Sequence, residues 1–120
     1  MYRTVHGSAI HHAVRGSALH QMVQGTAKKF RQFGFSMFYV YVFLCADKKM
    51  YVGYTQDLRK RVARHQKGQV NSTKARLPVK LIFYESYINK YDALRREKYL
   101  KTSKGKQTLT SMLKETFAKV

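Results

Sequence analysis

A ten-residue apolar run from Met37 to Ala46 is the feature that most limits how this chain can fold. The run is too short to cross a membrane as a helix, which requires roughly 20 apolar residues. Its Tyr, Val and Phe residues are typical of a buried strand, and we expect a strand over Phe38 to Leu44. The basic residues before the run leave a signal peptide as the alternative, although the run lacks the Leu and Ala of a signal core.

A second strand is expected directly after the first. Met50 to Tyr54 again combines Tyr and Val, and the segment between the two strands, Asp47 to Lys49, is short and polar. Two such segments joined by a few polar residues are typical of a β-hairpin.

Two helices are predicted from their candidate capping residues. Asp57 is placed to cap a helix that runs to about Gln66 and that Gly68 closes. Asn89 is placed to cap a second helix that ends near Thr102.

A third strand and a third helix complete the predicted fold. Val79 to Tyr87 alternates, which predicts a strand, and Lys106 to Ala118 is expected to be a helix. The alternation predicts two sets of strand side chains on opposite faces: Leu81, Phe83 and Glu85 on one face, and Ile82, Tyr84 and Ser86 on the other. The chain is therefore expected to be an α+β protein, with a three-stranded antiparallel sheet flanked by helices in the order ββαβαα over residues 37–120.

Residues 1–36 have a different character. They contain no acidic residue and repeat every nine positions, from Val5–Ala9 to Val14–Ala18 to Val23–Ala27. Each copy carries a glycine, which disfavours both helix and strand. We expect this segment to be a disordered leader, or translated upstream sequence with Met37 as the true start. A metal site is the other interpretation, and it would use four histidines: His6, His11, His12 and His20.

The charge points to a polyanionic partner. The chain has 24 Lys and Arg against six Asp and Glu, a formal net charge of +18. Such an excess repels itself in a compact state, and it is explained by a nucleic-acid partner. An anionic membrane surface is the competing interpretation, but the charge is spread along the chain instead of gathering on one amphipathic helix. The single cysteine, Cys45, rules out an internal disulfide and fits a reducing compartment such as the cytoplasm.

Five residues form a candidate constellation for phosphodiester chemistry. Tyr41 and Tyr51 come from the two strands of the expected hairpin. Arg61 and His65 lie four positions apart on the first helix, so they share one face. Glu97 lies among apolar residues of the second helix, an awkward place for a carboxylate that has no partner or metal. Each of these residues also has an ordinary structural explanation, and only their combination indicates a site.

At these residues the chain resembles the GIY-YIG nuclease superfamily. Tyr39-Val40-Tyr41 stands for the GIY element and Tyr51-Val52-Gly53 for the YIG element. Arg61 and His65 follow at the spacing of the family's arginine and histidine, and Ala93 to Glu97 is similar to the helix that presents the family's glutamate. Tyr39 takes the place of the first glycine. The loop before the third strand looks like that of small stand-alone bacterial members, which are related to the N-terminal domain of the excision-repair nuclease.

The resemblance implies a role for each residue. Tyr51 would activate or position the attacking water, Tyr41 would assist its orientation, and Arg61 would neutralise the phosphate. His65 would shuttle a proton or support Tyr51. Glu97 would hold one divalent cation, Mg²⁺ or Mn²⁺, and the shortage of acidic residues also favours a single metal.

The function implied is a metal-dependent endonuclease acting on DNA, branched or damaged forms included. RNA is an alternative substrate, and a binding module with a degenerate, inactive nuclease fold is an alternative function. Gly53 is expected to have a structural role. Seven basic residues are expected to contact phosphates without reading sequence: Arg59, Lys60, Arg64, Lys67, Lys74, Arg76 and Lys80.

Overall fold

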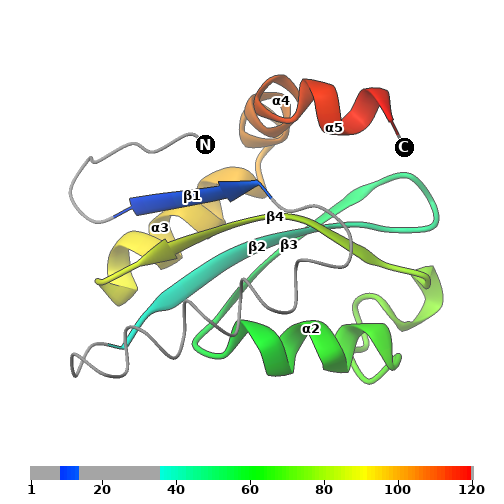
Figure 1. Cartoon of the computed structure of the whole chain (residues 1–120), viewed down its shortest axis with the longest axis horizontal. Coiled ribbons are helices and arrows are strands. Elements are labelled where there is room, and N and C mark those ends of the chain that lie inside the picture. The colour runs from blue at the N-terminus through cyan, green and yellow to red at the C-terminus, as the bar shows by residue number, and fades with distance from the viewer. Residues whose placement is uncertain (1–8, 14–35, 120) are drawn as a thin grey trace.

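A computed structural model describes residues 9–13 and 36–119 of the chain (Figure 1). Its strands are β1 (Ala9–Ala13), β2 (Phe38–Leu44), β3 (Met50–Thr55) and β4 (Lys80–Tyr87), and its helices are α2 (Leu58–Gln66), the 3₁₀ helix η2 (Lys74–Arg76), α3 (Lys90–Leu100), α4 (Ser103–Met112) and α5 (Lys114–Ala118). From residue 37 onward, this order confirms the predicted α+β fold and its antiparallel sheet of three strands.

The sheet carries a strand that the sequence did not predict. The strand order is β1-β4-β2-β3, and every pairing is antiparallel. β1 lies inside the predicted leader and pairs with the outer edge of β4, with Ile10 opposite Ser86. Its five residues contain none of the repeat's glycines, and the edge of β4 offers unpaired backbone groups to any extended segment. Residues 9–13 of the expected leader therefore form a strand, and the other residues of 1–35 lie outside the described part.

The hairpin turn forms without glycine. Lys48 takes a positive φ of 67°, and the Asp47 carboxylate accepts a hydrogen bond from the backbone N–H of Lys49 at 3.0 Å. The turn therefore uses a local side-chain bond where most tight turns use glycine.

The predicted caps of the first two helices are confirmed. The Asp57 side chain accepts from the backbone N–H of Lys60 at the start of α2, and the Asn89 side chain accepts from the second and third residues of α3. Gly68, with φ of 73°, follows the end of α2. Each helix therefore begins and ends within two residues of the prediction.

The predicted third helix is two helices. α4 begins at Ser103, three residues early, because Thr102 caps it through the backbone N–H of Gly105. At Leu113 the backbone leaves the helical conformation, with φ of −104° and ψ of 27°, and α5 follows. Leu113 is buried in the core, and Phe117 packs against the same cluster, so the break keeps both side chains on one apolar face.

The two faces of the sheet carry separate apolar clusters. One cluster packs under α2 and includes Tyr41, Phe43 and Leu58. The other packs under α3 and α4 and includes Val42 and Leu100. Opposite faces of one sheet therefore hold α2 and the α3–α4 pair.

A β-bulge in β4 overturns the predicted alternation. Val42 pairs with Phe83, but the next residue, Phe43, pairs with Leu81. Because Ile82 is the extra residue, Ile82 and Phe83 both belong to the cluster under α3. Leu81 therefore shares its face with Tyr84 and Ser86, and not with Phe83 and Glu85 as predicted.

No helix in the described ranges is long and apolar enough to span a bilayer.

A buried ion pair joins β4 to α3. Glu85 is fully buried, and its carboxylate accepts two hydrogen bonds from the Arg96 guanidinium, at 2.9 and 3.1 Å. The Tyr87 hydroxyl donates a third bond to the same carboxylate at 2.7 Å. Such bidentate geometry compensates the cost of placing the carboxylate in a low-dielectric interior.

We expect Glu85→Ala to destabilise the fold by about 3 kcal/mol or more, because it leaves the Arg96 charge half-buried and unpaired. Arg95→Ala is the matched control, since Arg95 pairs with Asp92 at the surface, at 3.2 Å. Urea unfolding monitored by circular dichroism would measure both variants. Equal, small losses would show that the Glu85 pair contributes no more than a surface pair.

Candidate active site

The hairpin places Tyr41 over a glycine. Tyr41 of β2 lies opposite Gly53 of β3. A Cβ atom added at Gly53 would overlap the ring and the hydroxyl oxygen of Tyr41. The Tyr41 ring therefore occupies the space that a side chain at position 53 would fill.

Helix α2 brings His65 onto the same face. His65 is fully buried, and its Nε2 is hydrogen-bonded to the Tyr41 hydroxyl at 3.1 Å. The centroid of the His65 ring also lies 4.7 Å from the ring centroid of Phe43 and 5.2 Å from that of Tyr51. The structure therefore brings Tyr41, Tyr51 and His65 together, as their positions on a hairpin and a helix predict.

Thr73 is part of this arrangement and was missed from the sequence. Its hydroxyl lies 2.7 Å from His65 Nδ1, and its side chain is fully buried. Thr73 occupies the N-cap position of η2 but makes no capping bond there, because its hydroxyl is turned inward to the imidazole. The only signal in the sequence is a threonine before a short basic helix, and that signal ordinarily indicates a cap.

Burial and nearby charges shift the pKa values of His65 and Tyr41. Burial lowers the pKa of His65 to about 4, and the nearby charges of Arg61 and Arg64 contribute to the same shift, so the imidazole is neutral at pH 7. Burial also raises the pKa of Tyr41, as do the nearby Tyr51 and Glu97 to a smaller extent, whereas Arg61 lowers it. Arg61 acts on both groups, so its guanidinium lies within electrostatic reach of the tyrosine and the histidine.

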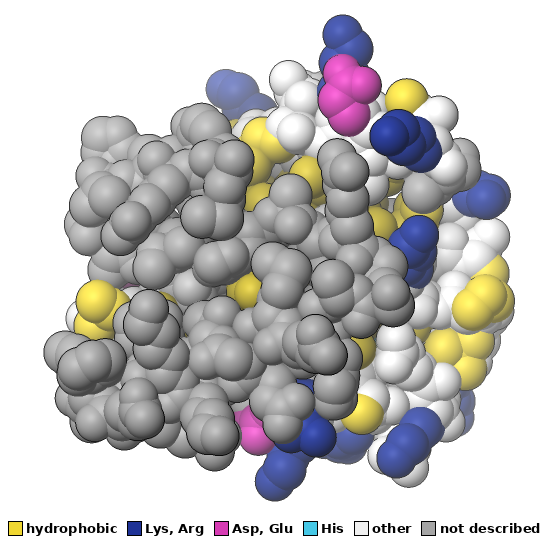
Figure 2. Space-filling model, in the orientation of Figure 1, with side chains coloured by type: hydrophobic (Ala, Val, Ile, Leu, Met, Phe, Trp, Pro, Cys, Tyr) yellow, Lys and Arg dark blue, Asp and Glu magenta, His cyan; other side chains and the backbone are white. Residues whose placement is uncertain are grey.

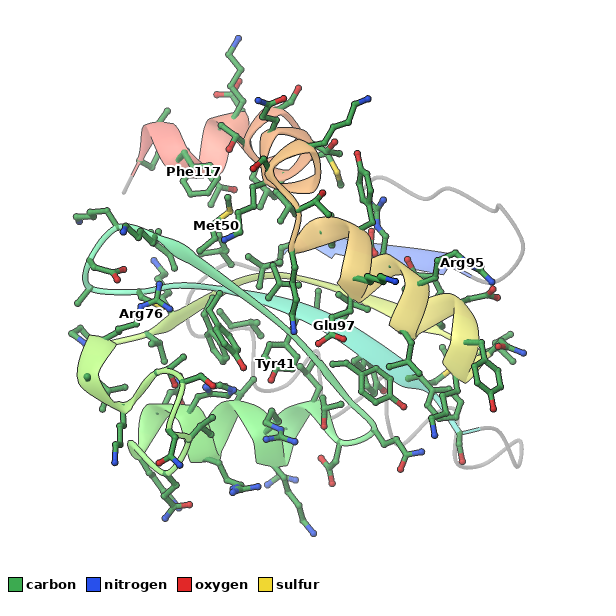
Figure 3. All side chains as sticks on the ribbon, turned by 180° about the vertical axis from the view of Figure 1, so that it is seen from behind. Tyr41, Met50, Arg76, Arg95, Glu97 and Phe117 are labelled. Carbon is green, nitrogen blue, oxygen red and sulfur yellow. The ribbon has the colours of Figure 1, made fainter. Side chains whose placement is uncertain are left out.

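Glu97 approaches the same place from α3. In Figure 3 its side chain lies next to that of Tyr41, in agreement with its effect on the Tyr41 pKa. The carboxylate pairs with Lys101, one helical turn away, at 3.2 Å, and the Glu97 side chain is 20% exposed. The Glu97 charge therefore acts on Tyr41 although α3 and the Tyr41 ring lie on opposite faces of the sheet.

The polar groups beside Glu97 fit a hydrated cation. The Tyr54 hydroxyl is buried without a hydrogen-bond partner among the described residues. Burial raises the pKa of Tyr54, and the Glu97 charge raises it further, so the Glu97 carboxylate lies within electrostatic reach of the Tyr54 hydroxyl. No group of three or more His, Cys, Asp or Glu residues gathers in the described ranges, so a cage made only of protein ligands is absent there. One carboxylate suits Mg²⁺, which keeps several of its waters.

The residues expected to contact phosphate differ in exposure. Six are exposed and form no ion pair within residues 36–119: Arg59, Lys60, Arg64, Lys67, Lys74 and Lys80. Arg76 differs from these six, because its guanidinium is held by Asp47 at 2.8 and 3.3 Å, beside the hairpin turn. On the face drawn in Figure 2, Lys and Arg side chains are spread around the described surface and acidic ones are few.

The chain belongs to the GIY-YIG family. The model of the GIY-YIG catalytic domain matches residues 37–110, which contain all five residues of the predicted constellation.

Its relatives include small proteins named UPF0213. It is 44% identical over 75 residues to the UPF0213 protein in the ldhD 5′ region of Pediococcus acidilactici, which covers 60% of this chain and 76% of the relative. It is 38% identical over 85 residues to the UPF0213 protein YsiG of Lactococcus lactis, covering 70% and 82%. A solution structure of the UPF0213 protein of Bacillus halodurans is 32% identical, covers 63% of this chain and 84% of that chain, and has a TM-score of 0.43.

We expect Gly53→Ala to destabilise the protein by about 1–3 kcal/mol, the usual cost of overpacking, because Tyr41 must move. The same substitution in a Tyr41→Ala background should cost much less, since the space is then open. Thermal unfolding of the four proteins of this double-mutant cycle would measure the coupling. Additive losses would show that the ring of Tyr41 does not impose the glycine.

We expect His65 to make stability fall as pH drops from about 6.5 to 4. The unfolded histidine titrates near 6.5 and the folded one at about 4, so the unfolded state binds the proton first. The contribution of His65 to the free energy of unfolding is fully present above pH 6.5. Its loss as the pH falls to about 4 amounts to about 3 kcal/mol. Urea midpoints at several pH values would test this by comparison with His65→Gln, which should show a flatter profile. Parallel profiles for the two proteins would contradict a buried neutral imidazole.

Proposed function

We propose that this protein is a metal-dependent endonuclease that hydrolyses phosphodiester bonds in DNA. The observation that carries the proposal is the contact of Tyr41, Tyr51 and a neutral His65, with Glu97 beside them from another helix. Hydrolysis needs an activated water and groups that neutralise the charge developing on the phosphate. The membership in the GIY-YIG family supports the same class of reaction.

Tyr41 and Tyr51 differ in burial, and we assign them different roles for that reason. Tyr41 is 2% exposed, and its hydroxyl is bonded to His65, so it holds the imidazole in place. Tyr51 is half-buried, and its ring lies 6.4 Å from that of Tyr41. Tyr51 therefore has the more accessible hydroxyl, and we assign it to positioning the attacking water and accepting or passing its proton.

His65 supports the tyrosines as a neutral hydrogen-bond partner. A histidine that is neutral at pH 7 has one ring nitrogen that can accept a proton. Thr73 holds Nδ1 and Tyr41 holds Nε2, which fixes the ring orientation. Because burial disfavours the charged imidazolium, His65 stays neutral at pH 7 and acts through its hydrogen bond to Tyr41.

Arg61 and Glu97 supply the charges. Arg61 is permanently cationic, and its planar guanidinium matches two phosphate oxygens. Glu97 would hold a single Mg²⁺ or Mn²⁺ together with water, exchanging its pair with Lys101. When bound, that cation would add positive charge at the phosphate.

DNA fits as the substrate because the basic surface follows one side of the candidate site. Four of the exposed contact residues are on or directly after α2, the helix that also carries Arg61 and His65: Arg59, Lys60, Arg64 and Lys67. Contacts of this kind bind the backbone and read no sequence.

Nicking of supercoiled plasmid tests the proposal. We expect nicking with Mg²⁺ or Mn²⁺ and none with chelator. Glu97→Ala should abolish nicking while binding stays intact, and Tyr51→Phe should slow it by roughly 10²- to 10⁴-fold. Glu115→Ala and Tyr91→Phe are matched controls, because both residues are exposed and lie outside the cluster, and they should retain full activity.

Normal nicking by Glu97→Ala in Mg²⁺ would remove Glu97 as the metal ligand. Binding to DNA without any nicking, under every metal condition, would favour a binding module with an inactive nuclease fold.

A further inference from the structure

A groove lies at the end of the molecule where the hairpin turn meets the last two helices. Its volume is about 460 Å³, and it is lined by Lys48, Lys49, Met50, Lys106, Thr110 and Phe117. Figure 3 shows Met50 and Phe117 side by side at this end, away from Tyr41 and Glu97. None of the six residues belongs to the candidate active site.

The groove carries uncompensated positive charge. Three of its six residues are lysines, from the hairpin turn and from α4. The ion pairs within residues 36–119 involve Arg76, Arg95, Arg96 and Lys101, and none of the groove lysines. Asp47, next to the turn, is already held by Arg76. The groove is therefore complementary to an anion.

The floor of the groove is apolar. Met50 and Phe117 are half-buried, and both pack against the core cluster under α3 and α4. Their remaining surface offers an aromatic ring and a thioether, which contact the face of a nucleobase favourably and discriminate little between bases. An anion that also has a flat apolar part fits both features, and a nucleotide unit is such an anion.

The groove also lies close to the candidate active site, because strand β3 contributes residues to both. Met50 precedes Tyr51 directly, and Gly53 is three positions further along β3 than Met50, roughly 10 Å at about 3.3 Å per residue. That span equals about three nucleotides of stacked DNA at about 3.4 Å each. In an intact duplex the base faces are stacked and out of reach, so the occupant must be unpaired.

We propose that this groove binds an unpaired nucleotide of the substrate, with its base against Phe117 and Met50 and its phosphates beside the three lysines. The inference rests on the proposed function, because it assumes that nucleic acid is the ligand. It narrows the substrate class to DNA that carries a single-stranded extension next to the duplex, as in a flap or an overhang.

Binding in chelator, without cleavage, tests the groove by itself. The ligands are a blunt duplex and the same duplex with a three-nucleotide extension at its 5′ or its 3′ end. Fluorescence anisotropy at about 150 mM salt would give the affinities, since exposed charges are partly screened there. We expect one extended duplex to bind at least fivefold more tightly than the blunt duplex, as stacking of one base contributes about this much or more.

Three variants of the full chain localise that preference. Phe117→Leu keeps the apolar packing but removes the aromatic ring, and Lys106→Ala removes one groove charge. Both should lose most of the preference and leave binding of the blunt duplex within about twofold. Lys104→Ala, an exposed lysine of α4 outside the groove, should keep the preference.

A 2-aminopurine base in the extension gives a second readout. We expect its fluorescence to be quenched on binding to the wild-type chain and less so with Phe117→Leu. Thermal unfolding confirms that each variant is folded. Equal affinity for blunt and extended duplexes, or a preference that both groove variants keep, would overturn the inference while leaving the nuclease proposal intact. No binding to any of the DNAs would overturn both.

Discussion

The hydrogen bond between the Tyr41 hydroxyl and His65 Nε2 ties helix α2 to the centre of the sheet. Tyr41 and His65 are both almost completely buried. A buried polar group that has no hydrogen-bond partner destabilises the fold by roughly 1–3 kcal/mol. Each group therefore depends on the other. Gly53 provides the space for the Tyr41 ring, and Thr73 provides the partner of the second imidazole nitrogen. One buried contact thus holds the hairpin, α2 and the loop before β4 in a single arrangement.

The features that depend on residues close together in the sequence could be predicted from the sequence. Capping by Asp57 and Asn89 needs only a side chain and the next turn of helix, so both caps are confirmed. The hairpin follows from two short strands with a polar connection, and it brings Tyr41 and Tyr51 together without further information. His65 reaches them because a helix that follows a hairpin directly must pack one face back on the sheet.

Contacts between distant segments could not be predicted in the same way. Arg76 is 29 positions from Asp47, and nothing local distinguishes it from the exposed basic residues around it. Thr73 has the local signature of a helix cap, but its hydroxyl serves the buried imidazole. The bulge at Ile82 depends on how β4 registers against β2, and alternation along β4 alone carries no trace of it.

The ion pairs of Glu85 and Glu97 explain why Glu97 is the better candidate of the two for a metal ligand. Glu85 is fully buried, and breaking its bidentate pair with Arg96 would strand a half-buried charge. Glu97 pairs instead with Lys101, whose side chain is 54% exposed, and a pair of that kind contributes about 1 kcal/mol or less. Lys101 would return to water at little cost if a cation replaced it, because its flexible stem reaches solvent easily. Of these two acids, Glu97 therefore combines an electrostatic effect on Tyr41 with a partner that is readily exchanged.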